Sequence, residues 1–168
     1  MKNIILCVIG FCLSLSGYFI SKQLEQRIKK LEKIYVLFSD ISSRIEFTAD
    51  SVTDIFYSLS FSENYSALPF VDRCKNQLQQ GDDFVTAWTC SLDDGNTSGL
   101  KKDDIDVLIS FGSSFGTTDV SGQISNCEIH KKLIESKIQS AQEDYKVYSK
   151  PAKGIGVLAG IALFIIFV

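Results

Sequence analysis

Histidine is nearly absent from this chain of 168 residues: His130 is the single one. It lies in the charged stretch 128–132, which indicates a surface residue rather than a catalytic base or a metal ligand. No glycine-rich loop is followed by Lys-Ser or Lys-Thr, so the sequence has no phosphate-binding loop of that kind. Three pairs of adjacent aspartates stand at expected helix starts and in loops, as solvated caps. We therefore predict no catalytic residue, no cofactor and no metal site, and an enzyme is the weakest function class.

The five cysteines form no C-x-x-C pair, which argues against a zinc site or a redox motif. Cys7 and Cys12 fall in an apolar stretch, while Cys74, Cys90 and Cys127 are far apart in the sequence. An odd number of scattered cysteines indicates small buried side chains in a reducing compartment rather than a disulfide framework.

No segment alternates β-branched and polar residues, so the sequence predicts no strand and an all-α fold. Apolar spacing, glycines and capping residues predict six helices. The expected ranges are from the N-terminal apolar stretch to about 47, then 52–59, 69–80, 84–92, about 101–115 and about 120–149, with Pro151 marking the join to the C-terminal apolar stretch. The apolar seam of the first runs through Leu24, Ile28, Leu31, Tyr35, Phe38, Ser42 and Ile45.

Both ends of the chain are apolar. Residues 4–20 are 17 uncharged positions, and 154–168 are another 15. Because about 17–25 helical residues cross a bilayer, we predict an N-terminal transmembrane helix at 1–21 and a C-terminal one at 151–168, flanking a domain at 22–150. Two alternatives stay open: a signal peptide cleaved near Ser16, and a buried core helix at the C-terminal end.

Basic residues set the expected orientation. They gather just inside the two expected anchors, which by the positive-inside rule places the central domain in the cytoplasm. These residues are Lys22, Arg27, Lys29, Lys30, Lys33, Lys146, Lys150 and Lys153. The net charge of −3 argues against a nucleic-acid partner.

The stretch 100–123 predicts a helix, a tight break and the start of a longer helix. Phe111, Gly112, Phe115 and Gly116 would form the closest helix–helix contact, because glycine lets a neighbouring backbone approach. Leucine at either glycine is therefore expected to impair folding. Asp119 would cap the longer helix.

A set of residues in fixed order and spacing runs through the centre of the chain: Ala87, Trp88, Ser91, Leu92, Leu100, Asp104, Leu108, Phe111, Gly112, Phe115, Gly116, Asp119 and Gln123. With Leu68-Pro69 and the tail 153–160, this set resembles the stage III sporulation protein AB family of endospore-forming bacteria. The resemblance spans essentially the whole chain. One departure is Ser51, where the family often has a proline; this change would loosen a helix start without altering the architecture.

The resemblance implies a bundle of about six helices, similar to the cytoplasmic domains of the type II secretion platform protein, the F component. It implies a non-catalytic membrane platform in the channel that joins mother cell and forespore. The protein would lie in the outer forespore membrane with its domain facing the mother-cell cytoplasm. The implied partners are the other channel subunits and the secretion-type ATPase of the complex, protein AA.

We predict eight helix-packing positions: Trp88, Leu92, Phe111, Gly112, Phe115, Gly116, Asp119 and Gln123. A possible partner surface is formed by the exposed charges Lys101, Lys102 and Asp103. The alternative function is a membrane-anchored sensor or ligand-binding module. A sensor predicts a cavity lined by the aromatic residues, whereas a platform predicts a filled bundle and a protein partner.

Overall fold

The fold is described from a computed structural model. It describes the backbone of residues 2–48, 51–60, 62–93 and 95–167. Side chains are described from 18 to 148, with residue 63 and the same gaps excepted.

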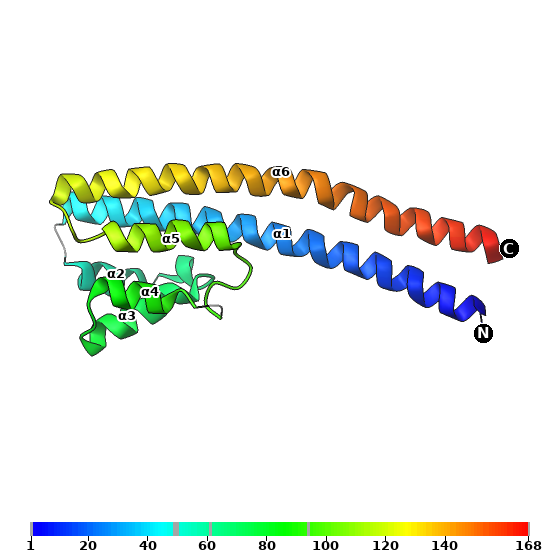
Figure 1. Cartoon of the computed structure of the whole chain (residues 1–168), viewed down its shortest axis with the longest axis horizontal. Helices are drawn as coiled ribbons and strands as arrows, with labels where there is room; N and C mark the ends of the chain where they lie inside the picture. Colours follow the sequence, from blue (N-terminus) through cyan, green and yellow to red (C-terminus); the bar gives the residue numbers. More distant parts are fainter. Residues whose placement is uncertain (1, 49–50, 61, 94, 168) are drawn as a thin grey trace. The chain divides into compact units, whose positions relative to one another are not determined.

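The described residues form six α-helices and a short 3-10 turn, with no strand among them (Figure 1). The elements are α1 (Lys2–Phe47), α2 (Val52–Ser60), η1 (Glu63–Tyr65), α3 (Pro69–Gln80), α4 (Phe84–Ser91), α5 (Lys102–Ser114) and α6 (Val120–Phe167). The all-α prediction is confirmed, and each expected helix is present.

Local chemistry sets the helix ends. The hydroxyl of Ser51 accepts from the Asp54 N–H at 3.2 Å and donates to the Asp54 carboxylate, so Ser51 caps α2. Pro69 occupies the first turn of α3, where its missing N–H costs nothing. Gly81 ends α3 with a φ of 96°, and the Asp83 carboxylate caps α4 by accepting from the Thr86 N–H.

The chain divides into two compact units, one of residues 29–138 and one of the segments 1–28 and 139–168. In the first unit, α1, α5 and α6 meet through aromatic side chains. The rings of Phe38 and Phe111 lie 4.3 Å apart between their centroids, and His130 of α6 meets Phe111 edge-on at 5.5 Å. The shorter helices α2, α3 and α4 pack on α5 through Trp88.

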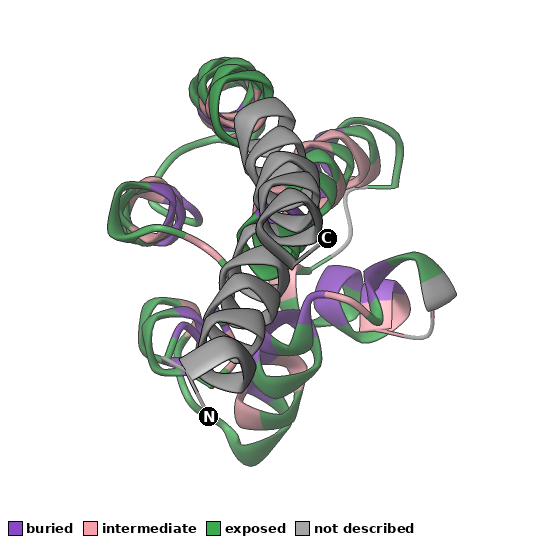
Figure 2. Cartoon of the chain, turned by 90° about the vertical axis from the view of Figure 1, so that its right-hand side faces the viewer, coloured by how far each residue is buried: buried purple, intermediate pink, exposed green. Residues whose placement is uncertain are grey.

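Helix α1 contributes more buried side chains to this unit than any other helix does. Six of its apolar side chains between 31 and 45 are at most 8% exposed, and three of them, Ile34, Leu37 and Ile41, lie outside the predicted seam. Figure 2 shows buried residues on the inward faces of the helices and exposed residues around the outside. The seam was too narrow because α1 has neighbours on more than one side, and a helix in that position needs a wider apolar face.

The prediction that His130 lies on the surface is wrong. Its side chain is buried, with Nδ1 2.9 Å from the Asn126 carbonyl oxygen and Nε2 3.3 Å from the Ser110 hydroxyl. Neighbouring charges in the sequence were misleading, because Glu128 and Lys131 form an ion pair with each other along the helix. Asp104 was also expected to be solvated, but it is fully buried.

In the second unit, Arg27 of α1 and Asp144 of α6 form an ion pair at 3.4 Å, and Arg27 is buried. The predicted anchors, 1–21 and 151–168, fall almost wholly in segments whose side chains lie outside the described residues. Among the described residues, no helix combines the length and the apolar character needed to cross a membrane.

The three described cysteines differ in exposure. Cys74 and Cys127 are buried as expected, whereas Cys90 is exposed, and all three are free thiols. Burial raises the pKa of the Cys74 thiol to about 12, and burial with nearby Glu128 raises the pKa of Cys127 to about 12. Because the folded pKa is raised, this contribution to stability is present below the ordinary pKa of 9.0 and is lost as the pH rises through about 12.

We expect a thiol reagent to label Cys90 quickly at pH 8 in the folded chain, and Cys74 and Cys127 only after unfolding. Peptide mapping by mass spectrometry separates the three sites. The same chain in denaturant is the control, where all three should label alike. Equal labelling of Cys74 and Cys90 in the folded chain would contradict the described burial.

Candidate functional site

The candidate site is built around Trp88, the chain's single tryptophan. Its indole N–H donates to the Leu108 carbonyl oxygen of α5 at 2.7 Å, and both groups are buried. The ring lies among four phenylalanines whose centroids are 5.5–5.7 Å away: Phe56, Phe70, Phe84 and Phe111. This aromatic cluster therefore joins α2, α3 and α4 to α5. Leu92, just past the end of α4, is also buried.

Gly112 lies directly against the indole. A Cβ at this position would stand 2.7 Å from Nε1 of Trp88, well inside van der Waals contact. Glycine is needed here for space, since any side chain would push the indole away from Leu108. The predicted close contact is therefore present at Gly112, and its partner is the Trp88 ring of α4.

Gly116 differs from Gly112 because its surroundings are open: nothing lies within 4 Å of where a Cβ would stand. Its φ of 82° is the left-handed conformation that glycine adopts after a helix end. The expectation that a neighbouring helix approaches Gly116 is wrong. This glycine reverses the chain after α5, and Phe115 beside it is buried against Phe84 with ring centroids 4.9 Å apart.

The corner between α5 and α6 is closed by one side-chain amide. Gln123 accepts from the Gly116 N–H at 3.0 Å and donates to the Thr118 carbonyl oxygen at 3.1 Å. Asp119 caps α6, since its carboxylate accepts from the Gly122 N–H at 2.9 Å. Gly116, Asp119 and Gln123 thus act together to hold one turn.

Two buried polar residues of this region were missed from the sequence. Asp104 accepts from the Lys101 N–H at 2.9 Å, so its carboxylate closes the first turn of α5. It stands at the third helical position, where acidic residues often make this bond, and that position was the available signal. His130 lies three residues after Cys127 and four before Ile134, so helical spacing places it on the buried face.

The predicted partner surface lies at the start of α5. Lys101, Lys102 and Asp103 are all exposed, and Asp103 approaches Lys137 of α6 at 3.8 Å. The structure brings these charges together on one turn, at the opposite end of α5 from Gly112 and the corner (Figure 1).

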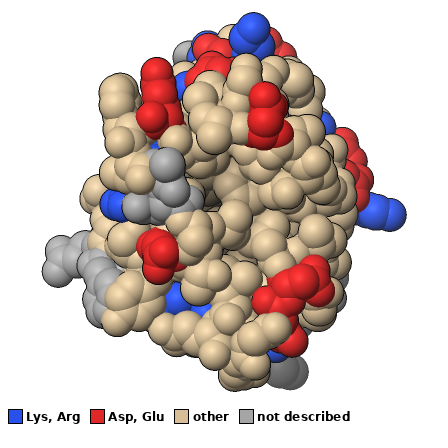
Figure 3. Space-filling model, turned by 90° about the vertical axis from the view of Figure 1, so that its left-hand side faces the viewer, with Lys and Arg blue, Asp and Glu red and all other residues tan. Residues whose placement is uncertain are grey.

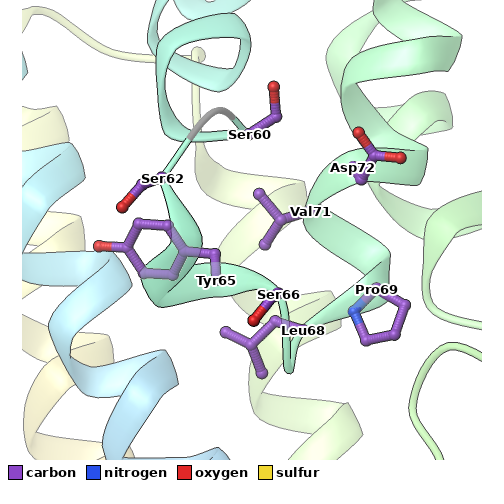
Figure 4. Close-up of a pocket in the computed structure, with 8 residues that line it drawn as sticks. All are labelled: Ser60, Ser62, Tyr65, Ser66, Leu68, Pro69, Val71 and Asp72. Atoms are coloured by element: carbon purple, nitrogen blue, oxygen red, sulfur yellow. The ribbon is translucent and has the colours of Figure 1, made fainter.

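The aromatic cluster is filled. Phe56, Phe70, Trp88 and Phe111 are fully buried, and three hollows among the described residues are lined by residues outside the cluster. One hollow of about 280 Å³ is lined mainly by small and polar residues, with Tyr65, Leu68 and Val71 (Figure 4). In the described part of the chain, no three His, Cys, Asp or Glu side chains cluster as metal ligands would.

A family model described as "Stage III sporulation protein AB (spore_III_AB)" matches residues 2–168. The chain belongs to this family. A curated relative, Stage III sporulation protein AB of Bacillus subtilis (strain 168), is 31% identical over 93 residues, which are 54% of this chain and 54% of the relative. The match thus spans about half the length of that relative.

A solved structure of a stage III sporulation protein AB has the same fold, with a TM-score of 0.62 at 19% identity; the match covers 72% of this chain and 97% of that chain. The residues by which the sequence resembles the stage III sporulation protein AB family include Trp88, Gly112, Gly116, Asp119 and Gln123. In the structure these residues build the aromatic cluster and the corner, so the resemblance has a packing basis.

Alanine at the two glycines should separate their roles. We expect Gly112→Ala to lower the free energy of unfolding by about 2–3 kcal/mol, since the methyl group overlaps a rigid buried indole. Gly116→Ala should cost about 1 kcal/mol, because it strains only the backbone. Thermal melts followed by circular dichroism measure both. Adding Trp88→Phe to Gly112→Ala should cost less than the sum of the two changes, and strict additivity would contradict the overlap.

Gln123→Leu should lower the free energy of unfolding by about 1–2 kcal/mol, because it removes both bonds that close the corner. Denaturant unfolding followed by Trp88 fluorescence measures the change. Gln142→Leu, at an exposed glutamine of the same helix, is the matched control and should stay within about 0.5 kcal/mol of the parent. Equal effects would remove the special role of Gln123.

Proposed function

We propose that this chain is a non-catalytic membrane platform of the channel that joins mother cell and forespore during sporulation. Membership of the stage III sporulation protein AB family carries the proposal, since the match runs along residues 2–168. The filled aromatic cluster supports a scaffold rather than a sensor, because its side chains are used in packing one another. The chain performs no bond-making step of its own in this role.

In the proposed arrangement, the apolar segments at 1–21 and 151–168 anchor the protein in the outer forespore membrane. The bundle faces the mother-cell cytoplasm. Each expected anchor belongs to a long helix, α1 (Lys2–Phe47) or α6 (Val120–Phe167).

The proposed partner is the secretion-type ATPase of the complex, by analogy with the F component of type II secretion. The exposed charges Lys101, Lys102 and Asp103 are the proposed contact. Their chemistry suits a partner surface of mixed charge. The other channel subunits would assemble around the platform.

The test is a pull-down of the organism's own purified ATPase by the full chain in nanodiscs. We expect saturable binding that Lys102→Glu weakens about threefold to tenfold, since it reverses one interface charge. Lys132→Glu, at an exposed lysine of α6, is the matched control. A folded chain that binds no ATPase would remove the docking role and leave family membership unchanged.

A further inference from the structure

An apolar hollow of about 180 Å³ lies between the end of α1, the start of α2 and the α5–α6 corner. Ile45, Val52, Ile55, Phe115, Thr118 and Val120 line it, and none of its lining residues is charged. All belong to the unit of residues 29–138. An engineered protein cavity of about 150 Å³ binds benzene, so this hollow has the size to hold one aliphatic or aromatic side chain.

The mouth of the hollow is accessible. Val120, the first residue of α6, is 53% exposed, and Thr118 beside it is also exposed. The floor is rigid, because Phe115 and Ile55 are buried and the Gln123 amide holds the corner. A rigid apolar hollow with an exposed apolar rim is the form in which protein surfaces hold an anchoring side chain.

Carboxylates surround this hollow. Glu46, Asp54 and Asp119 are exposed, and each is the sequence neighbour of a lining residue. Figure 3 looks onto the end of the bundle where these elements meet, and it shows carboxylates, with some lysine or arginine atoms between them, around a largely uncharged surface that is hollowed near its centre. The stretches 45–72 and 103–130, which supply the hollow, contain no lysine or arginine.

The charge of the chain is strongly segregated in sequence. Residues 45–130 carry fourteen carboxylates and four basic side chains, whereas the remainder carries six carboxylates and thirteen basic side chains. Two of those four basic groups are engaged locally: Arg73 approaches Asp93 at 3.6 Å, and Lys75 pairs with Asp72. Close to the hollow, the exposed carboxylates of Glu46, Asp54 and Asp119 outnumber the one basic sequence neighbour, Arg44, so the rim attracts cations.

We propose that this acidic end is a docking site for a basic segment of another protein. The segment inserts one Leu-, Ile- or Phe-sized side chain into the hollow and places lysine or arginine beside Glu46, Asp54 and Asp119. The apolar side chain supplies affinity, and the charges supply orientation and rate of association. This site is separate from the start of α5 and holds whether or not the chain docks an ATPase.

The test uses the full chain in a neutral maltoside detergent and a nonapeptide with a central photo-leucine flanked by lysine and glycine. We expect light-dependent cross-links to the residues that line the hollow, mapped by tandem mass spectrometry. The yield should fall as salt rises from about 50 to 500 mM, because exposed charges are screened. The same peptide with glutamate in place of lysine should give little product.

Paired variants locate the effect. Glu46→Lys should lower the apparent affinity about threefold to tenfold, while Glu135→Lys, an exposed carboxylate about 22 Å farther along α6 than Val120, should leave it unchanged. Val120→Trp should fill the mouth and block cross-linking, whereas Ile129→Trp, at an equally exposed position of α6, should not. Circular dichroism melts show whether each variant is folded. If Val120→Trp does not fold, the change in affinity with Glu46→Lys tests the proposal.

Three results would overturn the proposal. Cross-links that map elsewhere would remove the hollow as the site. Equal yields with the glutamate peptide, or equal losses in the control variants, would remove the role of charge. Self-association of the chain in sedimentation that Glu46→Lys abolishes would assign the hollow to a second copy of this chain, whose adjacent Lys132 and Leu133 are both exposed.

Discussion

The packing of Trp88 on Gly112 is the contact on which the rest of the bundle depends. The missing side chain at Gly112 lets the indole lie on the backbone of α5, and only from there does its N–H reach the Leu108 carbonyl oxygen. The phenylalanines of α2, α3 and α4 then pack around the ring. Burial of each aromatic side chain stabilises the fold by about 1.5–3 kcal/mol, and the Trp88–Gly112 contact positions several of them. Short helices depend on such packing for their stability, and none of α2 to α4 exceeds 12 residues.

The corner after α5 performs a different task with similar residues. Gly116 supplies a backbone conformation, Gln123 closes the turn, and Asp119 starts α6 in the correct direction. The direction of α6 in turn places His130 against Phe111 and Phe38, where its two ring nitrogens meet Asn126 and Ser110. The aromatic cluster and the corner thus fix neighbouring parts of the same helical hairpin, at the C-terminal end of α5.

Charge is unevenly distributed along the sequence. The acidic residues concentrate between 45 and 130, three of them beside the apolar hollow, and the basic residues gather toward the two ends of the sequence. Lys30 and Lys33 of α1 also donate to the carbonyl oxygens of Ser98 and Asn64, so part of the basic charge holds loops in place.

The sequence by itself determined the helices and most of their ends, because caps, glycines and apolar spacing act over a few residues: Asp83, Gly81 and Asp119 lie where such signals predict. It also singled out Trp88 and Phe111 of the aromatic cluster and Gly116, Asp119 and Gln123 of the corner, but not Phe56, Phe70 or Phe84. Local spacing placed Gly116 where a helix end favours positive φ, but tertiary structure alone decided which glycine is crowded, because Trp88, twenty-four residues before Gly112, packs against Gly112 and leaves Gly116 open. It also decided the burial of His130, the wide buried face of α1 and the apolar hollow. Each of these depends on several helices that are distant in the sequence, and local patterns carry no record of which neighbour a side chain will meet.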